Sequence, residues 1–230
     1  ASLVGSEMCI RDSYMSIYKS KEGRKKSLEL YDMQLSRLGL PCLDVYVETS
    51  FGKTHIVETG NREGTPLLVF HGGNSTSAYN LLMCNFLIDD FHLYAVDIIG
   101  HPGKSDEVCL SHRGYDYGKW ASEVIEKIGY EKISCFGGSF GGGVLAKLMC
   151  VAPEKVEKAV LVVPAGIDNA FPISSMKMMI PLLQYCITKK DKFLIKTALH
   201  MALNEDVLDK DTLDTVSYTH LRAHETSAHL

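Results

Sequence analysis

Apolar runs of five to eight residues alternate along the chain with longer segments that have helical spacing. Continuous apolar runs of this length are typical of strands buried on both faces of a parallel sheet. The predicted strands are residues 66–71, 92–98, 132–136 and 156–163, and the predicted helices are residues 18–38, 78–87, 115–128 and 140–151. Because strands and helices alternate, the chain is predicted to be an α/β protein. We expect a mostly parallel sheet with helices on both faces and right-handed crossovers.

Two shorter segments near the amino end alternate polar and apolar residues. Residues 44–49 and 53–58 show this pattern, and residues 50–52 (Ser-Phe-Gly) separate them. Such a pair of segments is typical of an antiparallel hairpin. The helical segment before it ends at residues 39–41 (Gly-Leu-Pro), a strong stop signal for a helix.

The pattern changes after Gly166. Residues 173–187, 191–203 and 205–213 have helical spacing and are rich in Met and Leu, without a strand-like run between them. We interpret residues 167–215 as a helical cap over an α/β core of residues 14–166. An adaptable, Met-rich surface over a site would suit apolar substrates. In the alternative interpretation, four of these methionines only fill a core: Met176, Met178, Met179 and Met201.

The two ends of the chain differ from the rest and are related to each other. A single DNA sequence can encode residues 4–13, and its reverse complement can encode residues 216–224. That DNA sequence resembles a transposon-type sequencing adapter, read in one sense at the start of the chain and in the other at the end. We therefore expect residues 1–13 and 216–230 to be artefacts and leave them out of fold reasoning. The natural segment is expected to run from Tyr14 to Thr215 and to be cut at both ends. This argues against a zinc site at the i,i+4 pair His220 and His224, which also lacks the Glu after the first His.

Composition narrows the class of protein further. The net charge is −4 with both signs mixed, so the overall charge gives no indication of binding to nucleic acid or an anionic membrane. No apolar run is long enough to span a membrane, and no signal peptide is visible. Apart from Cys9, the six cysteines form no CxxC pair and several lie in apolar runs, which favours thiols in a reducing compartment. We therefore expect a cytoplasmic, single-domain protein without a metal or another cofactor. The sequence does not set its oligomeric state.

Candidate chemistry lies between the predicted strand 132–136 and the predicted helix 140–151. Residues 137–141 read Gly-Gly-Ser-Phe-Gly, the Gly-x-Ser-x-Gly pattern of a nucleophile elbow. This tight turn raises the Ser139 hydroxyl above the sheet, so we predict Ser139 to be a nucleophile. The alternative is that residues 137–141 form an ordinary Gly-rich turn without a catalytic role. A substrate is expected to lie against Gly138, and the backbone N–H of Phe140 is predicted to bind the oxyanion.

A second oxyanion donor is expected from the loop after the strand 66–71. Residues 71–75 read His-Gly-Gly-Asn-Ser, and glycines allow backbone to approach a ligand closely. We predict the N–H of Gly73 to be this donor, with Asn74 as the alternative and as a residue that contacts substrate. His71 is expected to brace the loop rather than to act as the base.

Three blocks together resemble the α/β-hydrolase superfamily. They are residues 70–73 (Phe-His-Gly-Gly), residues 95–105 with Asp97 and Gly-His-Pro-Gly-Lys-Ser at 100–105, and residues 137–141. The resemblance covers residues 44–166 and extends to 167–215 as the cap. Residues 97–105 carry one residue more than the common form of that block, a detail similar to a small group of bacterial carboxylesterase-like members. The resemblance implies a serine hydrolase that acts on carboxylic esters, through an acyl-enzyme at Ser139, with a small ester substrate that has an apolar acyl group.

The acid and base of such a site are not found in the chain. In the superfamily they follow later strands in the order Ser, Asp or Glu, His. Asp168 lies just past a strand, and His200 is the only natural-segment histidine after Ser139, but we expect a cap hinge and a cap helix at these positions instead. The chain alone is therefore expected to be inactive. Residues 103–105 (Gly-Lys-Ser) are not predicted to bind phosphate, because Ile98 stands where the motif requires a glycine.

Other functions remain open on the same fold. A C–C bond hydrolase, an aminopeptidase of proline substrates and a perhydrolase would use the same elbow. A binding protein that keeps the fold without catalysis is a further alternative. Epoxide hydrolases and haloalkane dehalogenases are disfavoured, because those relatives carry aspartate at the position of Ser139.

Overall fold

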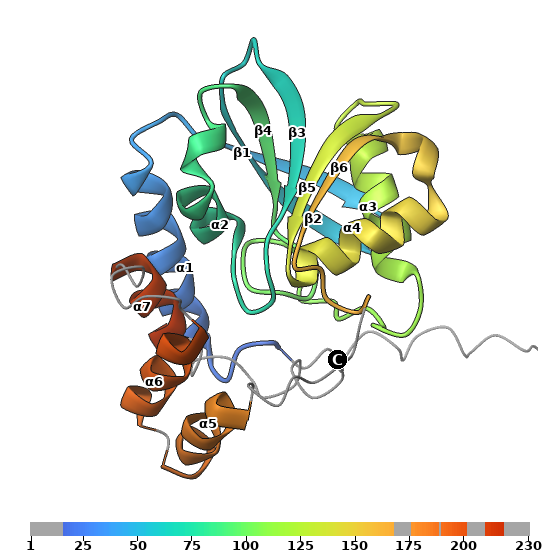
Figure 1. Ribbon diagram of the computed structural model, residues 1–230. Helices are drawn as coiled ribbons and strands as arrows, with labels where there is room; N and C mark the ends of the chain where they lie inside the picture. Colours follow the sequence, from blue (N-terminus) through green and yellow to red (C-terminus); the bar gives the residue numbers. More distant parts are fainter. Residues whose placement is uncertain (1–15, 168–175, 189, 202–209, 219–230) are drawn as a thin grey trace, which may run out of the picture.

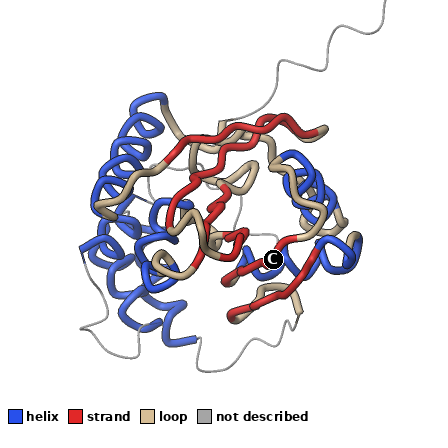
Figure 2. Tube along the Cα trace, turned by 90° about the horizontal axis from the view of Figure 1, so that it is seen from above, coloured by secondary structure: helices blue, strands red, loops and turns tan. Residues whose placement is uncertain are grey.

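The computed structural model describes residues 16–167, 176–188, 190–201 and 210–218. These residues form a mixed sheet of six strands in the order β1-β2-β4-β3-β5-β6, with helices on both faces (Figures 1 and 2). This confirms the predicted fold class. The strands are β1 (Leu43–Thr49), β2 (Gly52–Gly60), β3 (Thr65–Phe70), β4 (Phe91–Val96), β5 (Ile133–Gly138) and β6 (Val156–Val162). The helices that cover the sheet are α1 (Lys21–Arg37), α2 (Ser77–Met83), α3 (Asp116–Lys127) and α4 (Phe140–Val151).

The strand directions bring the loops that carry candidate chemistry to one end of the sheet. β1 and β2 form the predicted antiparallel hairpin, and β2 pairs antiparallel with β4. β3, β4, β5 and β6 are mutually parallel, so their carboxyl ends lie together. Ligands of open α/β sheets bind at this end. In Figure 1 it is the lower end of the sheet.

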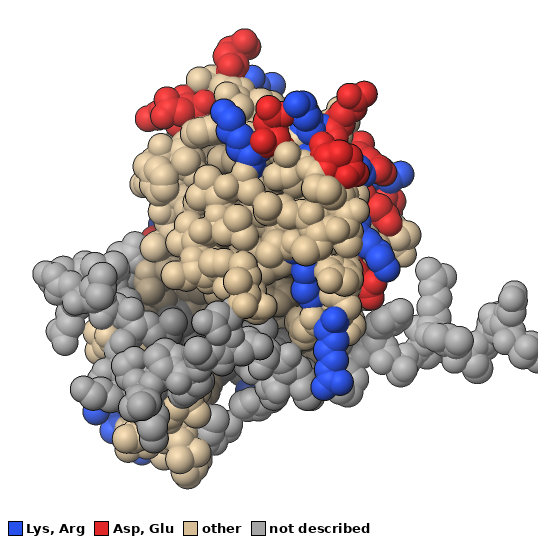
Figure 3. Space-filling view, turned by 45° about the vertical axis from the view of Figure 1, so that its right-hand side comes forward, with Lys and Arg blue, Asp and Glu red and all other residues tan. Residues whose placement is uncertain are grey.

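The opposite end of the sheet is charged. Figure 3 shows Lys, Arg, Asp and Glu side chains gathered at the upper end of the molecule, while uncharged residues cover the middle of that face. Mixed signs of this kind solvate a surface without giving it a strong field of one sign.

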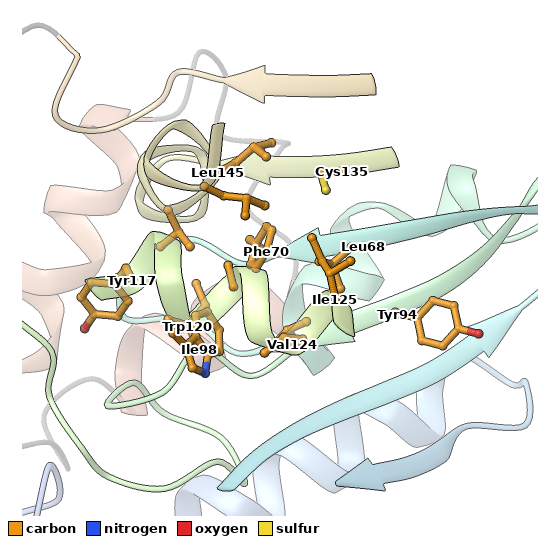
Figure 4. Close-up of a cluster of buried hydrophobic side chains, with 14 of the residues drawn as sticks. Leu68, Phe70, Tyr94, Ile98, Tyr117, Trp120, Val124, Ile125, Cys135 and Leu145 are labelled. Atoms are coloured by element: carbon orange, nitrogen blue, oxygen red, sulfur yellow. The ribbon is translucent and has the colours of Figure 1, made fainter. Parts of the chain in front are cut away.

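Two apolar cores hold the helices to the sheet. The larger one lies between the sheet and α3 and α4, and Figure 4 shows its side chains around Trp120. Trp120 is fully buried, and its indole Nε1–H donates to Thr54 Oγ1 at 2.8 Å, so its polar atom is satisfied. The smaller core lies on the other face, where Tyr31 of α1 and Leu81 of α2 pack against β3 and β4.

Element boundaries differ from the predictions by a few residues, and one such difference follows α2. A single helix was predicted over residues 78–87, but α2 ends at Met83, and residues 85–87 form a separate 3₁₀ turn. β4 ends at Val96 rather than at Ile98. The Asp97 N–H still bonds to the His55 carbonyl at 3.0 Å, after which the chain leaves the sheet.

The described carboxyl-terminal segments are helical, as predicted. The described helices are α5 (Met176–Thr188), α6 (Asp191–Met201) and α7 (Lys210–Tyr218), and residues 205–209 of the predicted helix 205–213 lie outside the described residues. α7 packs on α1 and α2: Gln34 Nε2 donates to Thr215 Oγ1 at 2.9 Å, and the Tyr79 hydroxyl lies 2.7 Å from Thr212 Oγ1. No helix in the described ranges is both long enough and apolar enough to cross a membrane. Of the two adapter-like segments, only residues 216–218 are among the described residues.

β6 forms an exposed edge of the sheet. Within the described part of the chain it pairs with β5 alone, and Val160 and Val162 are 52% and 44% exposed. Val163, just after the strand, is 80% exposed. An apolar edge strand of this kind favours association with another strand.

Candidate active site

Ser139 occupies a strained turn between β5 and α4. Its φ of 49° and ψ of −116° lie outside the regions that non-glycine residues prefer. Such a conformation costs about 1–3 kcal/mol and persists only where the surrounding structure enforces it. Here the Ser139 N–H donates to the Val162 carbonyl, and its own carbonyl accepts from the N–H groups of Gly143 and Ala165. The side chain is exposed above the sheet.

The glycines on either side of the serine differ in what they require. A Cβ on Gly137 would lie 2.5 Å from the Gly141 carbonyl oxygen, and one on Gly141 would lie 2.3 Å from the Phe70 carbonyl oxygen. These contacts are with backbone, which cannot move aside easily. Gly138, next to the serine, has nothing within 4 Å of its Cβ position. The turn therefore demands glycine at 137 and 141 but leaves space at 138.

Substitution of Gly141 by alanine is expected to lower the free energy of unfolding by about 3 kcal/mol or more, because the new methyl group overlaps the end of β3. Gly138→Ala is the matched control and should change it by less than about 1 kcal/mol. Urea unfolding of the two variants measures both values. Equal destabilisation by the two substitutions would contradict this description of the turn.

The loop between β3 and α2, residues 71–76, lies against this turn. A Cβ on Gly72 would be 3.7 Å from Ser139 Cβ, and one on Gly73 would be 3.5 Å from Phe140 Cβ. Asn74 follows in the left-handed region with φ of 55°. The Phe140 N–H belongs to the first turn of α4, where backbone donors have no partner within the helix. Backbone from two separate segments thus converges beside the Ser139 hydroxyl, and the positive end of the helix dipole faces it.

His71 braces this loop. Its imidazole is buried, Nε2 lies 3.0 Å from the N–H of Ile98, and Nδ1 lies 2.8 Å from the Gly72 carbonyl oxygen. Nε2 must therefore accept and Nδ1 must donate, which fixes a neutral tautomer. With both nitrogens bound to backbone, His71 ties the end of β3 to the chain that leaves β4.

A buried carboxylate fixes the other side of the loop. Asp97 is fully buried and accepts four hydrogen bonds: from His55 Nδ1 at 2.8 Å, the Ser77 hydroxyl at 2.7 Å, the Ser77 N–H at 3.1 Å and the Lys104 N–H at 2.9 Å. Burial by itself raises the pKa of Asp97, but the hydrogen bond and the charge of His55 outweigh it, and the pKa is lowered overall. Because Ser77 begins α2 directly after the loop, Asp97 anchors the loop's end.

The segment Gly103–Ser105 closes around the same carboxylate. A Cβ on Gly103 would lie 2.4 Å from Asp97 Cγ, and the Ser105 hydroxyl donates to the Asp97 carbonyl at 2.6 Å. The Lys104 N–H donates to the Asp97 carboxylate and Lys104 Nζ pairs with Asp32 and Asp44, so the groups that would bind a phosphate are engaged within the protein. This agrees with the prediction that the Gly-Lys-Ser sequence is not a phosphate loop.

An aromatic cluster holds Phe140, the residue after the serine. The ring centroid of Phe140 lies 4.4 Å from that of His101, 5.3 Å from Tyr117 and 5.6 Å from His112. Beside it is a small pocket of about 70 Å³, lined also by Val144 and by loop residues after β6. Sequence reasoning missed this cluster. Its only signal was the placement of His101 inside the block at 100–105.

Lys147 lies at the wall of this pocket. Its Nζ donates to the carbonyls of His112 and Gly114, and burial lowers the pKa of its ammonium group. These bonds pin the loop before α3 onto α4. The loop in turn holds the His112 ring against Phe140.

The structure brings the predicted residues Gly73, Phe140, Gly138 and Ser139 together, with Asn74 in the adjoining loop. Within the described ranges, it places no acid or base beside Ser139. Among the described residues, no side chain forms a hydrogen bond with Ser139 Oγ. Asp168 lies outside the described residues, and for His200 only the helical backbone of α6 is described.

The fold and the turn at Ser139 define a class: α/β proteins that present a serine at a sharp strand-to-helix turn. A family model described as alpha/beta hydrolase fold matches residues 65–191. The chain therefore belongs to the alpha/beta hydrolase fold family.

Two proteins of Bacillus subtilis (strain 168) are similar in sequence. Carboxylesterase YbfK is 33% identical over 156 residues, which are 68% of this chain and 52% of that protein. The uncharacterized carboxylesterase nap is 31% identical over 137 residues, which are 60% of this chain and 46% of that protein. The chain thus spans about half the length of these curated relatives.

Solved structures agree with the fold. The crystal structure of carboxylesterase CesB (YbfK) from Bacillus subtilis superimposes with a TM-score of 0.71 and 27% identity, covering 86% of this chain and 67% of that one. The naproxen esterase (carboxylesterase NP) from Bacillus subtilis gives a TM-score of 0.72, covering 90% of this chain and 70% of that one, at 23% identity. The second likeness concerns the fold alone.

Proposed function

We propose that this chain is the nucleophile-bearing part of a serine hydrolase that cleaves carboxylic esters. The observation that carries the proposal is the strained, exposed Ser139 with backbone of the 71–76 loop packed beside it. Several reactions can use a serine in this kind of turn, and the similarity to two carboxylesterases favours ester hydrolysis among them. We further propose residues 14–166 as the catalytic core, 167–215 as the cap, and 1–13 and 216–230 as artefacts.

In the proposed reaction, Ser139 Oγ attacks the ester carbonyl while a base takes the hydroxyl proton. The carbonyl oxygen becomes an oxyanion that accepts hydrogen bonds from the N–H groups of Phe140 and Gly73. Collapse expels the alcohol, which receives the proton from the base, and leaves an acyl-enzyme. Water then repeats the sequence and releases the carboxylic acid. Asn74 and Gly138 are proposed to contact the substrate.

The chain of residues 1–230 is proposed to be almost inactive by itself. Its described residues include no base hydrogen-bonded to Ser139, and both nitrogens of His71 are bound to backbone. A serine without a base keeps an ordinary alcohol pKa and reacts slowly. The acid and base are proposed to come from sequence beyond Thr215 in the complete gene product.

The proposed substrate is a small ester with an apolar acyl group. The pocket beside Phe140 is lined mostly by apolar groups, with His112 and Lys147 among them, and its small volume suits a short group on one side of the ester. We place the protein in the cytoplasm. The thiols of Cys42, Cys84, Cys109, Cys135 and Cys150 are unbridged, which supports a reducing compartment.

The complete gene product, read from the source DNA past the codon for Thr215, is expected to hydrolyse p-nitrophenyl esters. Residues 1–230 should do so with a kcat lower by a factor of about 10⁴ or more. Circular dichroism of both proteins controls for folding. Equal rates for the two would overturn the proposed division of the catalytic residues, and no ester hydrolysis by a folded complete protein would overturn the proposed function.

A further inference from the structure

Helix α5 exposes an apolar stripe. Ile180, Leu183 and Ile187 lie on one face at i, i+3 and i+7 spacing, and their side chains are 64%, 62% and 75% exposed. Met179, 44% exposed, extends the stripe. The opposite face carries Tyr185, which is 6% exposed, and α5 packs on α6. The helix therefore has a packed side and an apolar side that faces solvent.

The segment that contains this stripe is basic, whereas residues 204–215 after it are acidic. Residues 176–200 contain five lysines and a single acidic residue, Asp191, although the whole chain has a net charge of −4. The side chains of Lys190, Lys192 and Lys196 are exposed in and just before α6. In Figure 3, Lys and Arg atoms border uncharged ones at the lower end of the molecule, where α5 and α6 lie in Figure 1.

We propose that α5 and the start of α6 dock onto an anionic lipid surface. A helix with an apolar face and lysines beside it lies in the plane of a bilayer, its apolar side chains among the acyl chains and its lysines at the head groups. Lysines near an anionic leaflet are attracted over roughly 10 Å at physiological salt, so the local charge matters more than the total. The net charge of the whole chain is negative and so gives no indication of this locally basic segment.

Charge complementarity favours a lipid surface over a second copy of the chain. In a dimer packed stripe to stripe, each copy would bring its positively charged segment 176–200 to the contact, and like charges oppose such contact. An anionic bilayer can bury the apolar stripe among its acyl chains and pair the lysines with its head groups. The cap helices also lie toward the end of the sheet where the parallel strands finish (Figure 1), so docking there would place lipid near that end.

Co-sedimentation of the 230-residue chain with lipid vesicles tests this proposal. We expect binding to phosphatidylcholine:phosphatidylglycerol vesicles (7:3) and at least tenfold weaker binding to phosphatidylcholine alone. Lys190→Glu with Lys192→Glu should weaken binding to the anionic vesicles at least tenfold, and so should Ile180→Asn with Leu183→Asn. The matched control is Lys127→Glu with Lys158→Glu on α3 and β6, which makes the same charge change at other exposed lysines and should leave most of the binding intact.

A second variant reports insertion directly. Leu183→Trp adds an exposed indole, while the natural Trp120 is fully buried and gives a constant background. Its emission should shift to the blue with anionic vesicles and not with neutral ones. An unshifted emission, equal loss of binding in the Lys127/Lys158 control, or a dimer in sedimentation that Ile180→Asn with Leu183→Asn abolishes would each overturn the proposal. The test needs no catalysis, so its failure leaves the proposed esterase function untouched.

Discussion

Replacement of Ser139 by alanine is expected to lower the kcat of the complete gene product on p-nitrophenyl esters by a factor of about 10⁴–10⁶. The reason is that the alanine side chain cannot form the acyl-enzyme, while the backbone donors of Phe140 and Gly73 remain. The residual rate should therefore reflect oxyanion binding alone. KM should change little, because the hydroxyl contributes mainly to the transition state.

Ser36→Ala is the control for this prediction. Ser36 is exposed on α1, where its hydroxyl donates to the Met33 carbonyl at 2.7 Å, far from the turn at Ser139 in the sequence. Its kcat should stay within a factor of about two of the parent. A Ser139→Ala protein that is folded and keeps more than a tenth of the parent kcat would contradict the assignment of the nucleophile.

Replacement of Asp97 by alanine is expected to lower the free energy of unfolding by about 3–5 kcal/mol. It removes the acceptor of four hydrogen bonds and leaves the fully buried His55 ring without its buried partner. Asp32→Asn is the matched control, since Asp32 pairs with Lys104 while being 63% exposed. An exposed pair contributes only about 0–1 kcal/mol, so this control should be nearly neutral. Urea unfolding at neutral pH measures both.

The Asp97 carboxylate also predicts how stability depends on pH. Its pKa in the folded protein is lower than the value of 3.8 expected for an unpaired aspartate. The unfolded chain therefore binds this proton more tightly, and the stabilisation is fully present above about pH 4 and is lost as the pH falls below it. The parent should lose stability between about pH 4 and pH 2 by more than Asp97→Ala does. If both proteins lost the same free energy of unfolding over this pH range, the proposed role of the Asp97 carboxylate would be contradicted.

The alternating strands and helices of the core could be predicted because their pattern is strong. Buried parallel strands such as β3 are continuous apolar runs, and the alternating residues 44–49 and 53–58 on either side of a short turn predicted the hairpin of β1 and β2. The break between α2 and the 3₁₀ turn was missed, since residues 78–87 keep helical spacing through it. The packing of α7 on α1 and α2 was not predicted, for a different reason. Its contacts with α1 and α2 are tertiary, and no local pattern encodes them.

The candidate site was predictable as far as short motifs reach. The Gly-x-Ser-x-Gly pattern identified Ser139, because the turn it describes demands glycine at particular positions. The contacts that support the site join distant segments: His55 and Asp97 are 42 residues apart, and His101 and Phe140 meet only in the fold. The buried His55 in a hairpin strand has no local signal at all. It reads as an ordinary polar position of an alternating strand.

The most direct test of the central claim is mass spectrometry of the complete gene product after treatment with a fluorophosphonate. Such a reagent traps an activated serine by forming a bond between phosphorus and Oγ with loss of fluoride. We predict one adduct per chain, on the peptide that contains Ser139, and no adduct in Ser139→Ala. A folded protein that stays unlabelled, or that is labelled at another residue, would contradict the account.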